Sequence, residues 1–338
     1  FSGTAEDVTA RTLEASWSRG RDFASQLTGR SQSGQFSAIL NNESKDYSPF
    51  NTASPLTGSL LPGRKVQLTG TVAGTSYTLW QGYLQRIMPE PDIKGINTAH
   101  LEAIGPLGYL NQKKVSIPML TSVNSGSAIG TILDEAGWST ADRSVDGGNS
   151  TLDRFWTERI ETLEALRYVS ETEAGFLTES KDGKVVFEKR QHRLVSPHTE
   201  SQASFTDASN GTLVYMGIMQ EDPLPQIFNI LETSVRPFTV GSLGTLWILG
   251  ETGTNSPKID RSGTLIFWAQ YPNPDSPTED IGVDAWTTPA GTTDYTASAS
   301  AGTAIELTTE VSVAVQKFAQ SMEITLTGTI SPILTTSS

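Results

Sequence analysis

The feature that most constrains the fold of this chain is the alternation of apolar and polar residues in short segments. In residues 34–42, Phe36, Ala38 and Leu40 fall on one side of an extended backbone, and polar side chains fall on the other. A period of two is typical of a strand with one buried face, whereas a helix repeats about every 3.6 residues. The segment therefore predicts a half-buried strand.

Segments of the same kind recur through the first third of the chain, with Gly and Pro between them as turn signals. The predicted strands cover residues 34–42, 66–68, 77–83 and 98–105. Gly105-Pro106-Leu107-Gly108 then breaks the pattern. We predict that residues 1–110 form a small antiparallel β-barrel.

Residues 111–198 change to a helical period and predict a small α+β module. Apolar residues share one face in each of two segments, and residues that favour helix ends flank both segments. The first predicted helix covers residues 128–136, with Ser127 as its N-cap and Gly137 directly after it. The second covers residues 163–174, with Thr162 as its N-cap and Gly175 as the residue that ends it. Two short strands follow, and Asp182-Gly183 between them is a strong hairpin turn signal.

Residues 199–338 return to β-type patterns. The predicted strands cover residues 229–236, 244–249, 263–269, 304–308 and 322–327. We predict a second β region with a β-sandwich-like insertion at about residues 240–330. The predicted fold class is therefore mainly β with a small α+β insert, in which two antiparallel β-barrel domains flank an α+β module.

The charge balance argues against a nucleic-acid-binding protein. The 338 residues carry 37 acidic and 24 basic side chains, for a formal net charge of −13, whereas sequence-independent DNA binding needs a basic surface. An acidic wall that lets DNA slide past is compatible with this balance. The absence of cysteine excludes disulfides and thiolate metal sites. No apolar run is long enough to span a bilayer, and the N-terminus has no signal-peptide pattern.

Two ordered sets of segments carry a family resemblance. The first set is Trp17-Ser18-Arg19-Gly20-Arg21, Tyr47-Ser48-Pro49-Phe50-Asn51 and Leu61-Pro62-Gly63-Arg64. The second set is Ala136-Gly137-Trp138, Asp146-Gly147-Gly148, Gly175-Phe176 and the hairpin residues 182–190. In this order they resemble the tail-hub proteins of tailed bacteriophages, which are also called baseplate hub or minor tail proteins.

The resemblance implies a structural virion component at the tail tip and no enzyme activity. It implies a homotrimer in which the two barrels of each subunit alternate around a channel. The implied partners are the distal tail protein or tail tube protein above and the tail fibre or tip proteins below. Tape measure protein or genomic DNA would pass through the channel without specific binding, and no cofactor or membrane span is implied.

Arg19, Arg21 and Arg64 are the candidate subunit-interface residues. All three lie in the predicted first barrel of an acidic protein. Arginine binds carboxylates through two parallel hydrogen bonds, so these side chains are suited to pairing between subunits. The alternative is that they are solvent-exposed or pack their stems on aromatic rings.

Catalytic and metal sites find little support in the sequence. There is no G-x-S-x-G motif, and the histidines are His100 on a predicted strand and His192 and His198 in a loop. No zinc signature is present. Four side chains with oxygen donors surround a glycine pair and suggest a calcium site: Asp142, Asp146, Asn149 and Asp153. Their spacing departs from that of an EF-hand, so we interpret the segment as a polar turn.

The alternative function is a receptor-binding or glycan-binding tail adhesin. The predicted insertion contains aromatic side chains on which sugar rings could stack. They are Trp247, Trp268, Trp286 and Tyr271. Alternation along the predicted strands favours a core position for Trp247 and Trp268 instead.

Overall fold

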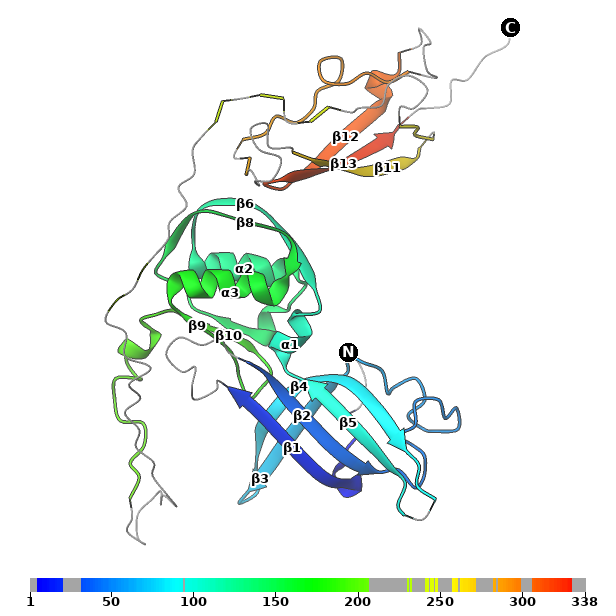
Figure 1. Ribbon diagram of the computed structural model, residues 1–338, viewed down its shortest axis with the longest axis vertical. Coiled ribbons are helices and arrows are strands. Elements are labelled where there is room, and N and C mark those ends of the chain that lie inside the picture. Colours follow the sequence, from blue (N-terminus) through cyan, green and yellow to red (C-terminus); the bar gives the residue numbers. More distant parts are fainter. Residues whose placement is uncertain are drawn as a thin grey trace. The chain divides into compact units, whose positions relative to one another are not determined.

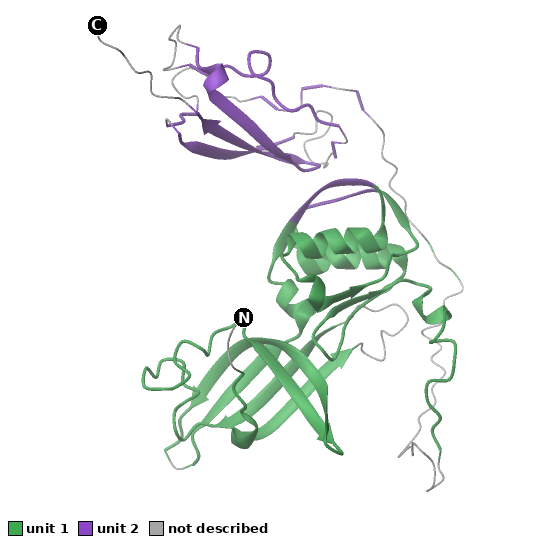
Figure 2. Ribbon diagram, turned by 180° about the vertical axis from the view of Figure 1, so that it is seen from behind, with its two compact units in different colours: residues 1–115, 122–153, 159–232 green, residues 116–121, 154–158, 233–338 purple. Residues whose placement is uncertain are grey.

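The computed structural model describes most of the first 206 residues and parts of the remainder. The described residues are 5–20, 32–93, 95–206, 230, 232, 241–242, 244–245, 247–248, 257–260, 262–271, 282–283, 285–298 and 306–329. The chain forms two compact units (Figure 2). Unit 1 comprises residues 1–115, 122–153 and 159–232, and unit 2 comprises residues 116–121, 154–158 and 233–338.

A curled antiparallel sheet of five strands opens unit 1 (Figure 1). The strands are β1 (Thr12–Gly20), β2 (Gln32–Asn41), β3 (Lys65–Val72), β4 (Thr75–Glu90) and β5 (Thr98–Ile104). They are ordered β1-β2-β5-β4-β3, so β1 and β3 are the edge strands. All four strands predicted for this region are present, and β1 is a strand that the alternation did not reveal.

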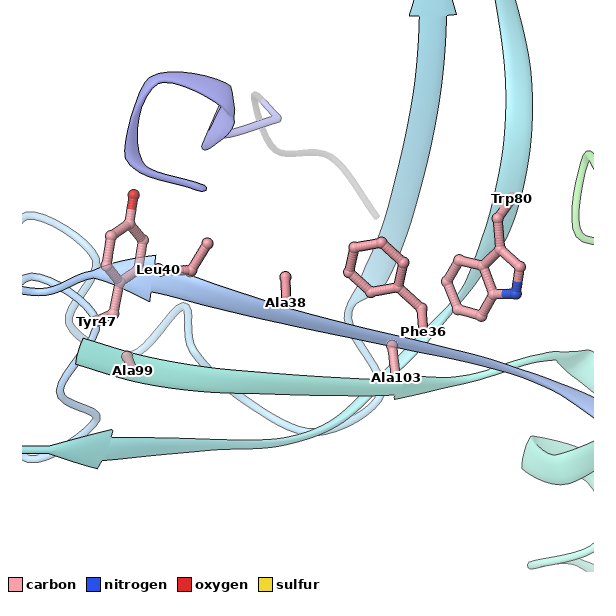
Figure 3. Close-up of a cluster of buried hydrophobic side chains, with 7 residues drawn as sticks. All are labelled: Phe36, Ala38, Leu40, Tyr47, Trp80, Ala99 and Ala103. Atoms are coloured by element: carbon pink, nitrogen blue, oxygen red, sulfur yellow. The ribbon is translucent and has the colours of Figure 1, made fainter. Parts of the chain in front are cut away.

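The core of this sheet lies on its concave face (Figure 3). Its buried side chains are Phe36, Ala38, Leu40, Tyr47, Trp80, Ala99 and Ala103. Phe36 stacks on Trp80 with ring centroids 5.3 Å apart. The predicted inward positions of β2 are therefore correct, and burial of this apolar surface is the main source of the sheet's stability.

The α+β module follows in the same unit. Its helices are α1 (Pro106–Leu110), α2 (Ser125–Glu135) and α3 (Thr162–Glu173), and its strands are β7 (Arg143–Val145), β9 (Phe176–Glu179) and β10 (Val185–Glu188). The strands form a sheet ordered β7-β10-β9, with β7 and β10 parallel. Helices α2 and α3 lie side by side (Figure 1). The predicted hairpin turn is present, with Gly183 at a φ of 71°.

Both helices were predicted, but three of their four predicted end residues differ from those in the structure, and Gly137 after α2 is the one that agrees. Asn124, not Ser127, caps α2, because its side chain accepts a hydrogen bond from the Ser127 amide at 2.7 Å. Thr162 is the first residue of α3, and its hydroxyl donates to the Lys113 carbonyl at 3.0 Å. Ala174, not Gly175, takes the left-handed conformation after α3, with a φ of 53°.

A two-stranded ribbon connects the elements of the module and was not predicted. It consists of β6 (Lys114–Asn124) and β8 (Thr151–Glu161). The ends of both strands belong to unit 1 and their middle residues to unit 2. Short 3-10 helices complete the described elements at Thr9–Arg11, Thr140–Asp142, His192–Leu194 and Thr308–Glu310.

Unit 2 contains a three-stranded antiparallel sheet ordered β11-β13-β12. The strands are β11 (Thr264–Gln270), β12 (Val311–Lys317) and β13 (Ser321–Gly328). Strands β11 and β13 were predicted, whereas β12 was not. One face packs on a cluster that includes Ala269, Met322 and Ile324.

Other predictions for residues 199–338 fared differently. The described residues of segment 244–249 do not form a strand. Within segment 304–308, Glu306 makes one bridge to Ser298, and Thr308 begins a 3-10 helix. Segment 229–236 lies almost wholly outside the described residues. The mainly-β fold class with a small α+β module is confirmed, whereas the second barrel and the three domain boundaries stay predictions.

Candidate assembly surface

The curled sheet is fastened to the α+β module by a buried carboxylate. Glu179, the last residue of β9, accepts hydrogen bonds from the Gly34 amide at 2.9 Å, the Leu107 amide at 2.8 Å and the Ser33 hydroxyl at 3.1 Å. Burial raises the pKa of the Glu179 carboxyl, and these hydrogen bonds offset only part of that rise. The carboxylate therefore joins β2, the start of α1 and β9.

An aromatic cluster makes a second connection between the same parts. Tyr83 of β4 stacks on Tyr109 of α1 with ring centroids 4.4 Å apart, and both contact Trp138. The Trp138 indole donates to the Asp142 carbonyl at 2.8 Å. Burial raises the pKa of Tyr83 to about 12. The Ala136-Gly137-Trp138 motif thus places a buried tryptophan against the curled sheet. This packing holds the sheet against the α+β module.

A second carboxylate holds the Asp146-Gly147-Gly148 loop. Glu173 at the end of α3 is fully buried and accepts from the Ser150 amide at 2.6 Å, the Asn149 amide at 3.1 Å and the Ser125 hydroxyl at 2.9 Å. Burial raises its pKa, but the hydrogen bonds outweigh burial and lower the pKa to about 2. Sequence patterns did not identify Glu173 or Glu179, because a glutamate at the end of a helix or strand is usually exposed.

The backbone geometry of β3 determines what its open edge presents. Ala73 and Gly74 have φ values of 49° and 80°, which are typical of a type I′ turn between the paired residues Val72 and Thr75. At the other end of the strand, the Arg64 carbonyl accepts from the Leu84 amide at 2.7 Å. Backbone groups alternate in direction along a strand, so even-numbered residues of β3 bond to β4.

The odd-numbered residues of β3 consequently direct their backbone N–H and C=O groups away from β4. These residues are Lys65, Gln67, Thr69 and Thr71. Within the described ranges, no strand pairs with this side of β3. Edge strands of soluble proteins are commonly protected by charges, prolines or bulges. Apart from Lys65, whose ammonium lies 3.5 Å from Asp142, residues 65–72 contain no charge and no proline, and their pairing with β4 shifts register once, between Leu68 and Thr69. This edge is suited to accepting another strand.

The opposite edge, β1, is more irregular than β3. Its pairing with β2 shifts register between Thr12 and Glu14 and again between Ser18 and Gly20. Such irregularities interrupt an edge strand and limit the length available for pairing. Trp17 is 48% exposed between these irregularities. The two edges of the sheet are therefore different surfaces, and each is accessible in the described part of the chain.

The candidate interface arginines lie close to these edges. Arg19 is an exposed residue of β1, and Arg64 is an exposed residue directly before β3. Arg21 lies outside the described residues. The structure brings two of the three predicted residues to opposite edges of one sheet, and their role in subunit contact stays a prediction.

The histidines and acidic residues considered for chemistry have local partners. His100 lies 3.2 Å from Glu90, and His192 lies 2.7 Å from Asp146. A groove of about 440 Å³ crosses β1, β2 and β5, but its Ser16 and Ser37 hydroxyls bond to each other at 2.9 Å. In the described part of the chain, no three His, Asp or Glu side chains are gathered to hold a metal ion. No described helix is long and apolar enough to cross a membrane.

Comparison with known proteins finds similarity among solved structures. No protein-family model matches this sequence, and no curated protein matches it. A 43 kDa tail protein of prophage MuSo2 from Shewanella oneidensis aligns at 16% identity and a TM-score of 0.34, over 47% of this chain and 46% of that one.

Two further solved structures align over similar lengths. A tail protein from Neisseria meningitidis MC58 has 11% identity, a TM-score of 0.35 and coverage of 51% of this chain and 45% of that one. The E. coli c3393 protein, a type VI secretion component described as similar to T4 tail proteins gp27 and gp5, has 10% identity, a TM-score of 0.33 and coverage of 47% and 43%. This chain spans less than half of each of these proteins, and likeness at this level assigns no function.

Proposed function

We propose that this chain is a tail-hub protein, a structural subunit of a homotrimeric ring at the tip of a bacteriophage tail. The ring joins the tail tube or distal tail protein to the tip or fibre proteins and surrounds the channel through which DNA leaves. Its role is mechanical, and it converts no substrate. The tail-hub resemblance of the two motif sets is the first support for this proposal.

The observation that carries the proposal is the position of the first motif set on the sheet. Residues 17–20 of the segment that contains Arg19 lie in edge strand β1, and the segment that contains Arg64 leads into edge strand β3. A closed ring of identical subunits needs two different surfaces on each subunit, each complementary to the other. Two unlike edges of one rigidly supported sheet meet this requirement.

Strand addition supplies the physical mechanism for ring closure. The outward backbone groups of β3, which no described strand pairs with, give an incoming strand a set of hydrogen bonds. Edge β1 carries Glu14 and Arg19, whereas Lys65 begins β3 and Arg64 directly precedes it. Two β3 edges in contact would bring together only basic groups, whereas contact between unlike edges can pair Glu14 with one of them.

Native mass spectrometry of the purified chain tests the proposal. We expect a trimer for the wild type and loss of the trimer for Thr71→Pro, which removes an outward N–H without removing a backbone hydrogen bond to β4. Thr71→Val is the matched control, because it keeps the N–H and the β-branched shape and, like the proline variant, lacks the hydroxyl that bonds to Ser76 of β4 at 3.0 Å. Thermal melting establishes that both variants are folded.

The outcomes separate the assembly from its mechanism. A monomeric wild type over the micromolar range would contradict the ring. A trimer that persists in folded Thr71→Pro would contradict the β3 contact alone. Arg64→Glu tests the predicted arginine role in the same assay, and an unchanged trimer would exclude that role.

A further inference from the structure

The sheet of unit 2 has an outer face that differs from an ordinary solvent-exposed surface. Along β11, Leu265, Phe267 and Ala269 turn toward the buried side, and the intervening residues turn outward. Trp268 is 40% exposed and Ile266 is 56% exposed on this outer face. The prediction that Trp268 belongs to the core was therefore wrong, because the alternation places Phe267 there instead.

Polar side chains flank Trp268 on the neighbouring strands. The pairing register places Trp268 opposite Glu323 of β13, and Glu323 opposite Gln316 of β12. Cross-strand neighbours on one face have Cβ atoms about 5 Å apart. An indole, a carboxylate and a primary amide thus form one row across the sheet.

The Trp268 ring has a buried support. It stacks on Phe318, which is 3% exposed, with ring centroids 5.4 Å apart and an angle of 25° between the planes. Such packing limits the rotamers of an exposed aromatic side chain and so reduces the entropy lost when a ligand binds. The indole is a preorganised platform.

We propose that this outer face binds a neutral carbohydrate, with one sugar ring stacked on Trp268 and its hydroxyls bonded to Glu323 and Gln316. A pyranose ring has an apolar C–H face that matches an aromatic surface, and its hydroxyls suit planar carboxylate and amide groups. Specific ligand sites generally combine an apolar surface with a few convergent polar groups.

The charge of the face decides between possible ligands. Of the outward side chains on the described residues of β11, β12 and β13, Glu323 is the one that ionises, and the others are Thr, Ser, Ala, Gln and Ile in addition to Trp268. A lone carboxylate opposes phosphate, sulfate and uronic acid groups, and an anionic membrane surface would require basic residues. A cationic group would match the indole and the carboxylate but would leave the Gln316 amide unused. A neutral glycan is the ligand class that matches all three groups.

A glycan array probed with the full-length chain tests this proposal. We expect binding to neutral oligosaccharides and a loss of at least about tenfold in affinity for Trp268→Ala, as for removal of a central aromatic contact. Tyr168→Ala is the matched control, because Tyr168 is a similarly exposed aromatic side chain on α3 of unit 1 and lies on neither edge strand. We expect Gln316→Ala to weaken binding about threefold to tenfold, the value of one hydrogen bond.

Gln316→Ala also keeps the test informative if Trp268→Ala is poorly folded, since Gln316 is an exposed residue. Three results would overturn the proposal. They are no binding to any glycan, binding confined to sialylated or sulfated glycans, and equal binding by the wild type and folded variants of this face. None of these results bears on the trimer, which mass spectrometry measures independently.

Discussion

The carboxylate of Glu173 provides a quantitative test of how the α+β module is held together. Its pKa is lowered from 4.5 to about 2 in the folded chain by hydrogen bonds from Ser125, Asn149 and Ser150. One pKa unit corresponds to about 1.4 kcal/mol, so ionised Glu173 contributes about 3 kcal/mol to the free energy of unfolding at neutral pH. Because Glu173 is fully buried, solvent screens little of this energy.

The sign of the pH dependence follows from the direction of the shift. A carboxyl with a lowered pKa in the folded state stabilises that state above the unfolded pKa, near 4.5, and loses the contribution as the pH falls toward about 2. We expect Glu173→Gln to lower the free energy of unfolding by about 3 kcal/mol at neutral pH. We expect the difference from the wild type to disappear below about pH 2.

Urea denaturation followed by the far-ultraviolet helix signal is the appropriate assay, because the described α-helices all belong to unit 1. Glu135→Gln at the exposed end of α2 is the control, and we expect a change within about 0.5 kcal/mol. A Glu173→Gln variant as stable as the control at neutral pH would refute the assigned role of the carboxylate. A difference that persists unchanged at low pH would also contradict it.

Three further predictions concern unit 1 and are measured by the same denaturation assay. Gly105→Ala is expected to lower the free energy of unfolding by at least about 2 kcal/mol, because the added methyl would overlap the Glu179 carboxylate. The control is Gly130→Ala, in open space on α2, which is expected to be neutral or stabilising by up to about 1 kcal/mol. Equal effects of the two substitutions would contradict the close approach of Gly105 to Glu179. Ala174→Gly is expected to stabilise by about 0.5–1 kcal/mol, because a glycine adopts the left-handed conformation without strain, and a destabilised variant would be the opposite result. Trp138→Ala is expected to cost about 3–5 kcal/mol through the loss of its contacts with two tyrosines, and a loss below about 1 kcal/mol would show that this cluster does not support the sheet.

The sequence was most informative where the pattern depends on near neighbours. Phe36, Ala38 and Leu40 revealed the inward face of β2, and Asp182-Gly183 revealed the hairpin, because side-chain alternation and turn geometry are local properties. The same reasoning failed for Trp268. Alternation specifies which residues share a face, and the tertiary core decides which face is buried.

The candidate assembly surface depended even less on local pattern. Arg19 and Arg64 were identified from motifs, but their positions at opposite edges of one sheet follow from the strand order β1-β2-β5-β4-β3. Pairing between β2 and β5 joins segments that are distant in the chain, and no periodicity encodes that choice. The buried carboxylates of Glu173 and Glu179 could likewise not be predicted, because the backbone amides that donate to them come from distant segments of the chain.

By itself, the sequence determined the β-rich class, the two longer helices and the polarity of most strands, since each of these depends on residues within a few positions of one another. The tertiary structure alone decided which strands are edges, which acidic groups are buried and which tryptophan faces outward. These properties depend on burial and hydrogen bonding between distant segments, whose energies exist only once the chain has folded.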